Sequence, residues 1–293
     1  FVETDIFFSK KLATKIGVRA ENTSILNEFT LSPRASISYK SGKNSQFSFA
    51  YGQFYQNPND NYLKFNQNFT SENTSHYIAN YQSVKQGQIF RIEAYYKDYN
   101  NLVKFDGNQP NFTSNYNNNG KGYAKGVDVF WRQNGKIKNT DYWVSYSYLD
   151  TKRDYRNYPT TATPNFAAKH NLSVVGKHWI EKWKSQVGIS YTFASGRNYT
   201  NPNEVGFLNN KTKSYNSVSL NWAYLLDQQK ILYFSVNNAL NTQNVFGYNY
   251  ANQPNMNGNF DRQAILPNQD SFFFIGFFWT ISDNKNDNQL NNL

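Results

Sequence analysis

LSPRASISYKSGKNSQFSFAYGQFYQNP, which runs from Leu31 to Pro58, is the stretch that decides the fold. It holds two runs of alternating residues joined by Ser-Gly-Lys-Asn at positions 41–44. In the second run, the rings of Phe47, Phe49 and Tyr51 alternate with Ser48, Ala50 and Gly52. A period of two places alternate side chains on opposite faces of a strand. The stretch therefore predicts an antiparallel hairpin with one apolar face and one small, polar face.

The same alternation recurs along the chain, and some of its polar positions are charged. In Ile89–Tyr99, one face holds Phe90, Ile92, Ala94 and Tyr96, whereas the other carries charged side chains. Charged side chains on the lipid side of a membrane strand are destabilising, so we expect these to line a water-filled lumen. The residues predicted to line the lumen are Arg91, Glu93, Lys97, Asp128 and Arg132. Rings outside and polar groups inside predict an all-β protein, a transmembrane antiparallel β-barrel.

Thirteen period-two runs are expected as strands of this barrel, and they span residues 1–282. Besides the two runs of the hairpin, they are Val2–Ser9, Lys15–Asn22, Ser75–Val84, Ile89–Tyr99, Gly122–Arg132, Asp141–Leu149, Asn171–Lys177, Ser185–Ala194, Tyr215–Tyr224, Lys230–Asn238 and Ser271–Ile281. Residues 283–293 are expected to form a polar, disordered C-terminal tail.

The connections fall into short and long classes. The short ones hold Lys and Gly, and the long ones, such as Asn100–Gly120 and Ala239–Gln269, hold Asn, Tyr, Pro and Ser. Bacterial barrels have short periplasmic turns, long extracellular loops and an even number of strands. The expected number of strands, thirteen, is odd, and the first strand is expected to run from the outer surface towards the periplasm. Such a barrel lacks at least one strand of the opposite direction, so we expect this chain to be part of a larger barrel. A closed barrel of about fourteen strands remains the alternative.

Composition narrows the possible functions. The net charge of +10 suggests nucleic-acid binding, but the lysines are spread over the short turns rather than gathered on one surface, so no nucleic-acid partner is predicted. The longest apolar run, Phe272–Trp279, is too short for a membrane helix. Without cysteine, the chain has no disulfide, zinc–thiolate site or cysteine nucleophile.

No catalytic or metal-binding pattern stands out. His76, His170 and His178 lack the local spacing of a metal site, and no Ser is placed beside a His and an acid. Gly120, Gly122 and Gly126 do not have dinucleotide-loop spacing, and they are expected to ease a loop into a crowded lumen-facing strand. We therefore expect a protein that is not an enzyme and that has no cofactor or bound metal.

Two loops carry candidate ligand-binding residues. Arg offers a planar fork for carboxylate or phosphate, and Tyr offers a flat face and a hydroxyl. An anionic or sugar-like ligand is the functional interpretation, and ordinary solvated surface is the alternative. The candidates are Arg153, Tyr155, Arg156, Tyr158, Arg197 and Tyr199.

The tryptophans are interpreted mainly as aromatic girdles at headgroup depth, and a ligand platform is the alternative for a few. The residues assigned to the girdles are Trp131, Trp179, Trp183, Trp222 and Trp279.

Several segments, taken in order, resemble the barrel of TonB-dependent outer-membrane receptors, particularly those of Bacteroidetes. They are Leu31–Pro58, NNNGKGYAKGVDVFW (Asn117–Trp131), TPNFAAKHNLSVVGKHW (Thr163–Trp179), YTFASGRNYTNPN (Tyr191–Asn203), SVNNALNTQNVFGY (Ser235–Tyr248) and FFFIGFFWTI (Phe272–Ile281).

The resemblance implies the C-terminal part of a barrel of twenty-two strands around a plug, in the bacterial outer membrane. It also implies import of a scarce nutrient: a siderophore, cobalamin, glycan or peptide. The expected partners are the lipid bilayer with lipopolysaccharide, the TonB complex through a plug that this sequence does not contain, and a surface lipoprotein or other outer-membrane assembly. The alternatives are a passive diffusion porin of about fourteen strands and an accessory barrel of a larger assembly.

Overall fold

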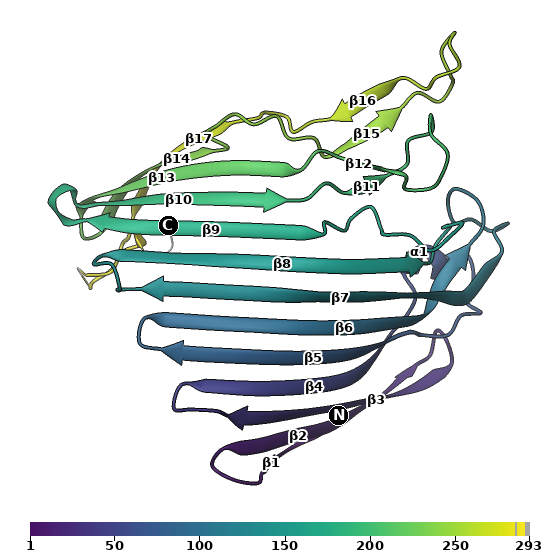
Figure 1. The fold of residues 1–293 in the computed structure, drawn as a ribbon, viewed down its shortest axis with the longest axis horizontal. Coiled ribbons are helices and arrows are strands. Elements are labelled where there is room, and N and C mark those ends of the chain that lie inside the picture. Colours follow the sequence, from purple (N-terminus) through teal and green to yellow (C-terminus); the bar gives the residue numbers. More distant parts are fainter. Residues whose placement is uncertain (285, 291–293) are drawn as a thin grey trace.

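Thirteen antiparallel strands form one continuous sheet in the computed structural model, which describes residues 1–284 and 286–290 (Figure 1). Each strand pairs with the next in the sheet order, as expected for hairpins that follow one another along a chain. The strands are β1 (Val2–Phe7), β2 (Leu12–Thr23), β3 (Glu28–Lys40), β4 (Ser45–Gln56), β5 (Glu72–Lys85), β6 (Gln88–Phe105), β7 (Tyr116–Asn134), β8 (Thr140–Asp154), β9 (His170–Ile180), β10 (Ser185–Ala194), β13 (Tyr215–Asp227), β14 (Lys230–Asn237) and β17 (Phe272–Trp279). The predicted all-β fold and thirteen strands are confirmed.

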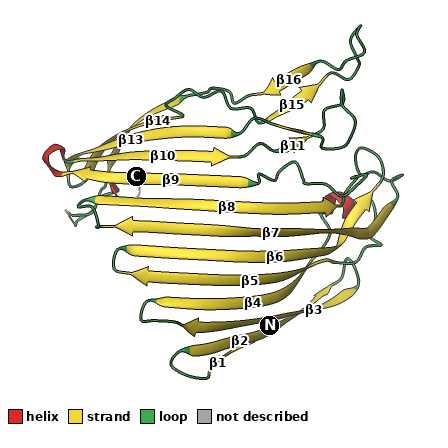
Figure 2. Ribbon diagram, in the orientation of Figure 1, coloured by secondary structure: helices red, strands yellow, loops and turns green. Residues whose placement is uncertain are grey.

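The sheet is curved and open, with β1 and β17 at its two edges (Figure 1). Short turns gather at one end of the strands and long connections at the other, as Figure 2 shows. The predicted division into two loop classes therefore corresponds to the two ends of the sheet.

Strand register gives the sheet two faces of different chemistry. One row across strands β4 to β8 joins Phe49, Ala79, Ala94, Val127 and Tyr148, and we call their side of the sheet the apolar face. A second row joins Gly52, His76, Lys97, Ala124 and Thr151, and we call that side the polar face. Large apolar side chains on the apolar face are exposed in this chain, as expected of a surface that meets lipid.

Strands β6 and β7 are longer than the alternation predicts. The sequence predicts a loop over Asn100–Gly120, but β6 continues to Phe105 and β7 starts at Tyr116. The register between them shifts between Tyr99 and Lys104, where Asn101 has a left-handed φ of 57°. Such a bulge interrupts the period of two, which hides the end of the strand from sequence analysis.

The long connections contain regular structure where plain loops were expected. They hold helix α1 (Asp60–Leu63) and two small hairpins, formed by β11 (Asn198–Tyr199) with β12 (Asn210–Lys211) and by β15 (Gly247–Tyr250) with β16 (Arg262–Ile265). In the described part of the chain, no helix has the length and apolar character needed to traverse a membrane.

Trp179 corrects the prediction that this residue belongs to an aromatic girdle. β9 continues to Ile180, and Trp179 pairs with Gln186 of the polar face. Its ring packs against a buried cluster of Ala223, Leu225 and Ile231. Leu290, from the predicted tail 283–293, packs on the same cluster, while residues 285 and 291–293 lie outside the described residues.

Candidate binding site

The five residues predicted to line a lumen share the polar face. Glu93 pairs with Asp128 of β7, and Lys97 pairs with His76 of β5. Arg91 pairs with Gln82 of β5 and with Phe130 of β7, and its side chain lies on the same face as those of Glu93 and Lys97. Cross-strand partners point to the same side of a sheet, so these side chains form one charged surface.

The fifth of these residues, Arg132, makes a two-point ion pair near the short-turn end. Its Nε donates to Asp141 Oδ1 at 3.0 Å, and its Nη2 donates to Asp141 Oδ2 at 2.5 Å. Trp143 lies beside the guanidinium, with the ring centre 5.8 Å from Arg132 Cζ. This arrangement also occupies the polar face, because Arg132 pairs with Trp143 in the ladder between β7 and β8.

A cavity of about 400 Å³ lies at the long-loop end of the polar face. It is lined by residues of α1, of strands β4, β5, β6 and β8, and of the segment that follows β8. We call it the rim pocket and define it by Tyr62, Glu72, Thr74, Tyr99, Arg153, Tyr155 and Arg156. Three of the six predicted ligand-binding residues are therefore brought together.

The bulge in β6 builds one wall of the rim pocket, and Asn118 holds that bulge in place. The Asn118 side-chain nitrogen donates to Asn101 O at 2.9 Å and to Thr70 O at 3.2 Å, and its oxygen accepts from Thr70 N at 3.1 Å. Beyond the bulge, Val103 N donates to Glu72 Oε1 at 3.0 Å. The carboxylate of Glu72 is thus fixed against the strand.

Arg156 is positioned by its backbone. With a left-handed φ of 52°, its N donates to Val103 O at 2.7 Å, and its O accepts from Phe105 N at 3.1 Å. These two bonds form a short parallel bridge to the extension of β6. The turn after β8 is therefore docked onto β6.

Arg153 lies in β8 rather than in a loop, which corrects the sequence prediction. Its backbone pairs with Gly122 of β7, and it also exchanges hydrogen bonds with Ala162 at 2.9 and 3.0 Å. The missing side chain of Gly122 leaves room for Arg153, since a Cβ there would come within 2.8 Å of Arg153 Cγ.

The interior of the rim pocket combines cations with aromatic faces. Arg153 Cζ lies 4.3 Å from the centre of the Tyr99 ring, and Arg156 Cζ lies 5.1 Å from that of Tyr155. Burial raises the pKa of Tyr62, and the nearby Arg156 opposes this effect. At neutral pH the phenol of Tyr62 therefore stays protonated and able to donate a hydrogen bond.

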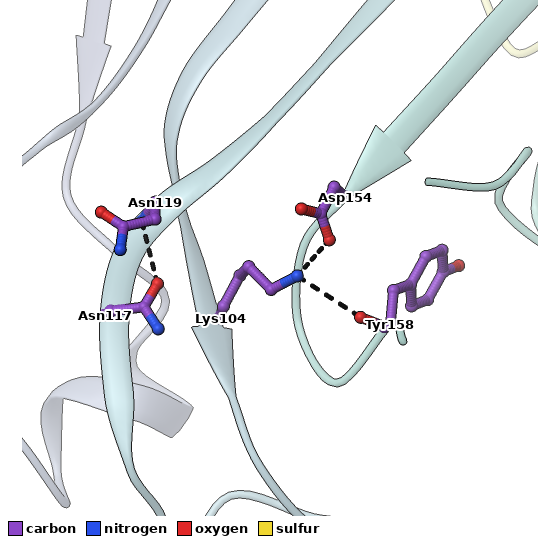
Figure 3. Close-up of polar contacts among 5 residues, drawn as sticks. All are labelled: Lys104, Asn117, Asn119, Asp154 and Tyr158. Atoms are coloured by element: carbon purple, nitrogen blue, oxygen red, sulfur yellow. Dashed lines mark hydrogen bonds and ion pairs between the residues drawn. The ribbon is translucent and has the colours of Figure 1, made fainter. Parts of the chain in front are cut away.

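Tyr158 supports the rim pocket from behind. Its ring meets that of Tyr155 at 4.8 Å and that of Phe207 at 4.7 Å. Burial raises the pKa of Tyr158, and the adjacent Tyr155 adds to the effect. Lys104 ties this turn to β6, because its Nζ donates to Asp154 Oδ1 and, at 3.4 Å, to Tyr158 O (Figure 3).

The other two predicted residues lie apart from the rim pocket. Tyr199 packs on Tyr248 at 4.8 Å, and Arg262 reaches both, with its Cζ 4.4 Å from the Tyr248 ring and its Nη1 3.5 Å from Tyr199 Oη. Arg197 lies just beyond β10, where its N donates to Thr212 Oγ1 at 3.0 Å. The predicted set therefore divides between two regions.

Sequence analysis missed Tyr62, Glu72, Thr74 and Tyr99 as residues of the site. Local spacing gives no sign of them, because α1, β5 and β6 bring them to Arg153 across intervals of 54 to 91 residues in the chain. Only the pairing register of the strands would reveal that these residues meet. A single sequence does not fix that register where a bulge interrupts the strand.

The chain belongs to the TonB-dependent receptor-like β-barrel family, whose model matches residues 1–239. This membership places it in the bacterial outer membrane. No curated protein sequence matches it.

Solved structures of similar fold are receptors and transporters. They include the siderophore receptor PiuA from Acinetobacter baumannii, with a TM-score of 0.72 and 13% identity over 94% of this chain and 42% of that one. The FrpB iron transporter from Neisseria meningitidis gives 0.70 and 10%, over 94% and 44%. The ferric-catecholate import receptor Fiu from Escherichia coli K12 gives 0.69 and 11%, over 94% and 43%. The chain thus spans less than half the length of these three relatives.

Proposed function

We propose that this chain is the C-terminal part of a twenty-two-strand TonB-dependent receptor that imports a scarce nutrient across the outer membrane. The observation that carries the proposal is the two-faced, open sheet of thirteen strands within a receptor-barrel family. An open edge in lipid leaves backbone groups unpaired, so β1 and β17 require further strands. Two further points support this proposal. This chain covers less than half the length of each of the three relatives, and its sequence resembles that of Bacteroidetes receptors.

In this proposal the polar face lines the passage, and the rim pocket captures the substrate at the extracellular end. Arg91, Glu93, Lys97, Asp128 and Arg132 then meet water or a plug supplied by the rest of the protein. Lipopolysaccharide surrounds the apolar face, and TonB acts through the plug. A surface lipoprotein is a further candidate partner at the long loops.

A siderophore is the first candidate among the four nutrient classes. The three named relatives are an iron transporter, a siderophore receptor and a ferric-catecholate import receptor. Their identities of 10–13% support the fold alone, so cobalamin, glycan and peptide stay in the comparison.

Nutrient uptake by cells that carry the full-length protein, with and without TonB, tests this function. We expect growth on the limiting nutrient to require both the protein and TonB. Uptake that persists without TonB, together with steady conductance in a planar bilayer, would instead identify a diffusion porin. Uptake that is unchanged when the protein is deleted would point to an accessory barrel.

A further inference from the structure

We infer that the short-turn end of the sheet binds anionic phospholipid headgroups of the periplasmic leaflet, through its lysines and the apolar side chains between them. The inference goes beyond the proposed function, because it needs only a membrane barrel and names the lipid class that this end selects. The short turns of bacterial barrels lie on the periplasmic side of the membrane.

Positive charge is concentrated at this end of the sheet. Six turns lie there, joining β1 to β2, β3 to β4, β5 to β6, β7 to β8, β9 to β10 and β13 to β14 (Figure 2). Together with the strand ends beside them, they carry ten lysines and two acidic residues, Glu181 and Asp227. Glu181 pairs with Lys138 at 3.6 Å and Asp227 with Lys230 at 2.8 Å, whereas the other eight lysines form no ion pair within the described residues. This excess of positive charge along one edge favours an anionic partner.

The kind of cation favours a lipid surface. These turns and strand ends contain no arginine. Lysine is a flexible point charge, whereas the planar fork of arginine suits a ligand that is held in one orientation. Successive turns of hairpins lie about 10 Å apart along the end of a sheet. A row of lysines at such intervals fits many mobile phosphate groups better than it fits one bound anion.

Exposed apolar side chains lie between the lysines. Residues 136–138 are Lys-Ile-Lys and residues 182–184 are Lys-Trp-Lys, and Ile137 and Trp183 are 56% and 61% exposed. Phe8, which is 63% exposed, precedes the two lysines of the first turn. A phospholipid leaflet presents phosphate and, just below it, acyl chains, so a single turn can place cations and an apolar group in it together. A folded acidic partner does not require this pattern in three separate turns.

Rings on the apolar face mark the depth of this edge. Trp279, the last residue of β17, pairs with Lys230, whose Nζ lies 5.5 Å from the centre of the ring. Tyr39 pairs with Phe47 of the apolar face, is exposed, and directly precedes Lys40 at the end of β3. Trp and Tyr concentrate at headgroup depth in membrane proteins. The lysines beside these rings are therefore placed at the level of the lipid phosphates.

Native mass spectrometry of the purified full-length protein in detergent tests the inference, with phosphatidylglycerol and phosphatidylcholine of identical acyl chains as competing probes. The first headgroup is anionic and the second has no net charge, so we expect phosphatidylglycerol to bind about tenfold or more tightly. Added salt should reduce this preference, because it screens exposed charges. Equal binding of the two lipids would overturn the inference, and an acidic protein would become the candidate partner of these lysines.

A matched pair of variants separates the short turns from total charge. The first removes the four lysines that flank Ile137 and Trp183 and should lower the preference for phosphatidylglycerol about tenfold: K136Q/K138Q/K182Q/K184Q. The second removes four exposed lysines at the long-loop end and should keep the preference: K121Q/K152Q/K211Q/K213Q. Equal losses of the preference in the two variants would overturn the assignment to the short turns.

The double variant I137S/W183S tests the apolar contribution. It should weaken binding of both lipids by similar factors and leave the preference for phosphatidylglycerol in place, because both lipids carry the same acyl chains. Unchanged binding of both lipids would overturn the role assigned to these two side chains.

These outcomes are independent of the uptake experiment. TonB-dependent uptake by a protein that shows no lipid preference would retain the proposed function and reject the lipid-binding edge. A preference that depends on the short-turn lysines, in a protein whose uptake does not need TonB, would retain the edge and reject the function.

Discussion

Gly126 and Gly176 both lie inside long strands, yet their surroundings differ. A Cβ at Gly126 would lie 2.1 Å from Tyr148 O and 2.5 Å from the Tyr95 hydroxyl, whereas one at Gly176 would meet only Ile189 Cγ2 at 3.7 Å. We expect G126A to lower the free energy of unfolding by about 1–3 kcal/mol through overpacking, and G176A to change it by less than about 0.5 kcal/mol. Denaturant unfolding of the full-length protein in lipid vesicles measures both, and equal effects would contradict the register between β7 and β8.

Ile189 and Ser190 test the two faces at neighbouring positions of β10. Ile189 pairs with Leu220 on the apolar face and is 52% exposed, whereas Ser190 pairs with Ser219 on the polar face. I189R should destabilise the membrane-inserted protein by roughly 2–4 kcal/mol if it meets lipid near mid-bilayer, because arginine there is costly. S190R faces water and should be far milder. Heat-modified mobility of the folded protein on gels compares the two variants, and an equal loss would reverse the assignment of faces.

The bulge of β6 shapes one wall of the rim pocket, and the Asn118 side chain binds its backbone at Asn101. N118A removes the exposed bonds to Thr70 and the part-buried bond to Asn101 O, and we expect loss of the latter to cost about 0.5–1.5 kcal/mol. We expect faster hydrogen exchange over residues 99–104 and at the Thr70 amide. N119A is the matched control, since Asn119 is exposed and bonds through its backbone N to Asn117 Oδ1 (Figure 3). Unchanged exchange in N118A would show that the bulge is held by other contacts.

At the scale of elements, sequence analysis located strand interiors better than strand ends. The alternation in Val187–Phe193 or Phe47–Tyr51 follows from one face meeting lipid, so it is visible in the sequence. At the long-loop ends of β6 and β7, a bulge at Asn101 and the glycines at 120 and 122 interrupt the alternation. For the same reason the sequence pattern places Arg153 in a loop, whereas the structure places it in β8. Of the six candidate residues, Arg153, Tyr155 and Arg156 line the rim pocket, and Arg197 and Tyr199 lie elsewhere.

The whole sheet is open, and this bears on how the chain behaves alone. Edges β1 and β17 expose unpaired backbone groups that lipid cannot satisfy. We expect residues 1–293 by themselves to aggregate and to give no steady pore, while the full-length receptor inserts as a closed barrel. Refolding of both into lipid vesicles, followed by conductance and protease protection, measures this. A steady pore from residues 1–293 alone would contradict the partial-barrel proposal.

The measurement that tests the account most directly is the accessibility of single cysteines placed in turn at positions 187–194 of the full-length receptor in outer membranes. The chain contains no cysteine, so each introduced thiol is its only label within this region. In a background free of other cysteines, thiols at 188, 190, 192 and 194 should react with a small water-soluble maleimide, and those at 187, 189, 191 and 193 only with a lipid-soluble one. Uniform labelling, or the opposite alternation, would contradict a sheet whose polar face meets water and whose apolar face meets hydrocarbon.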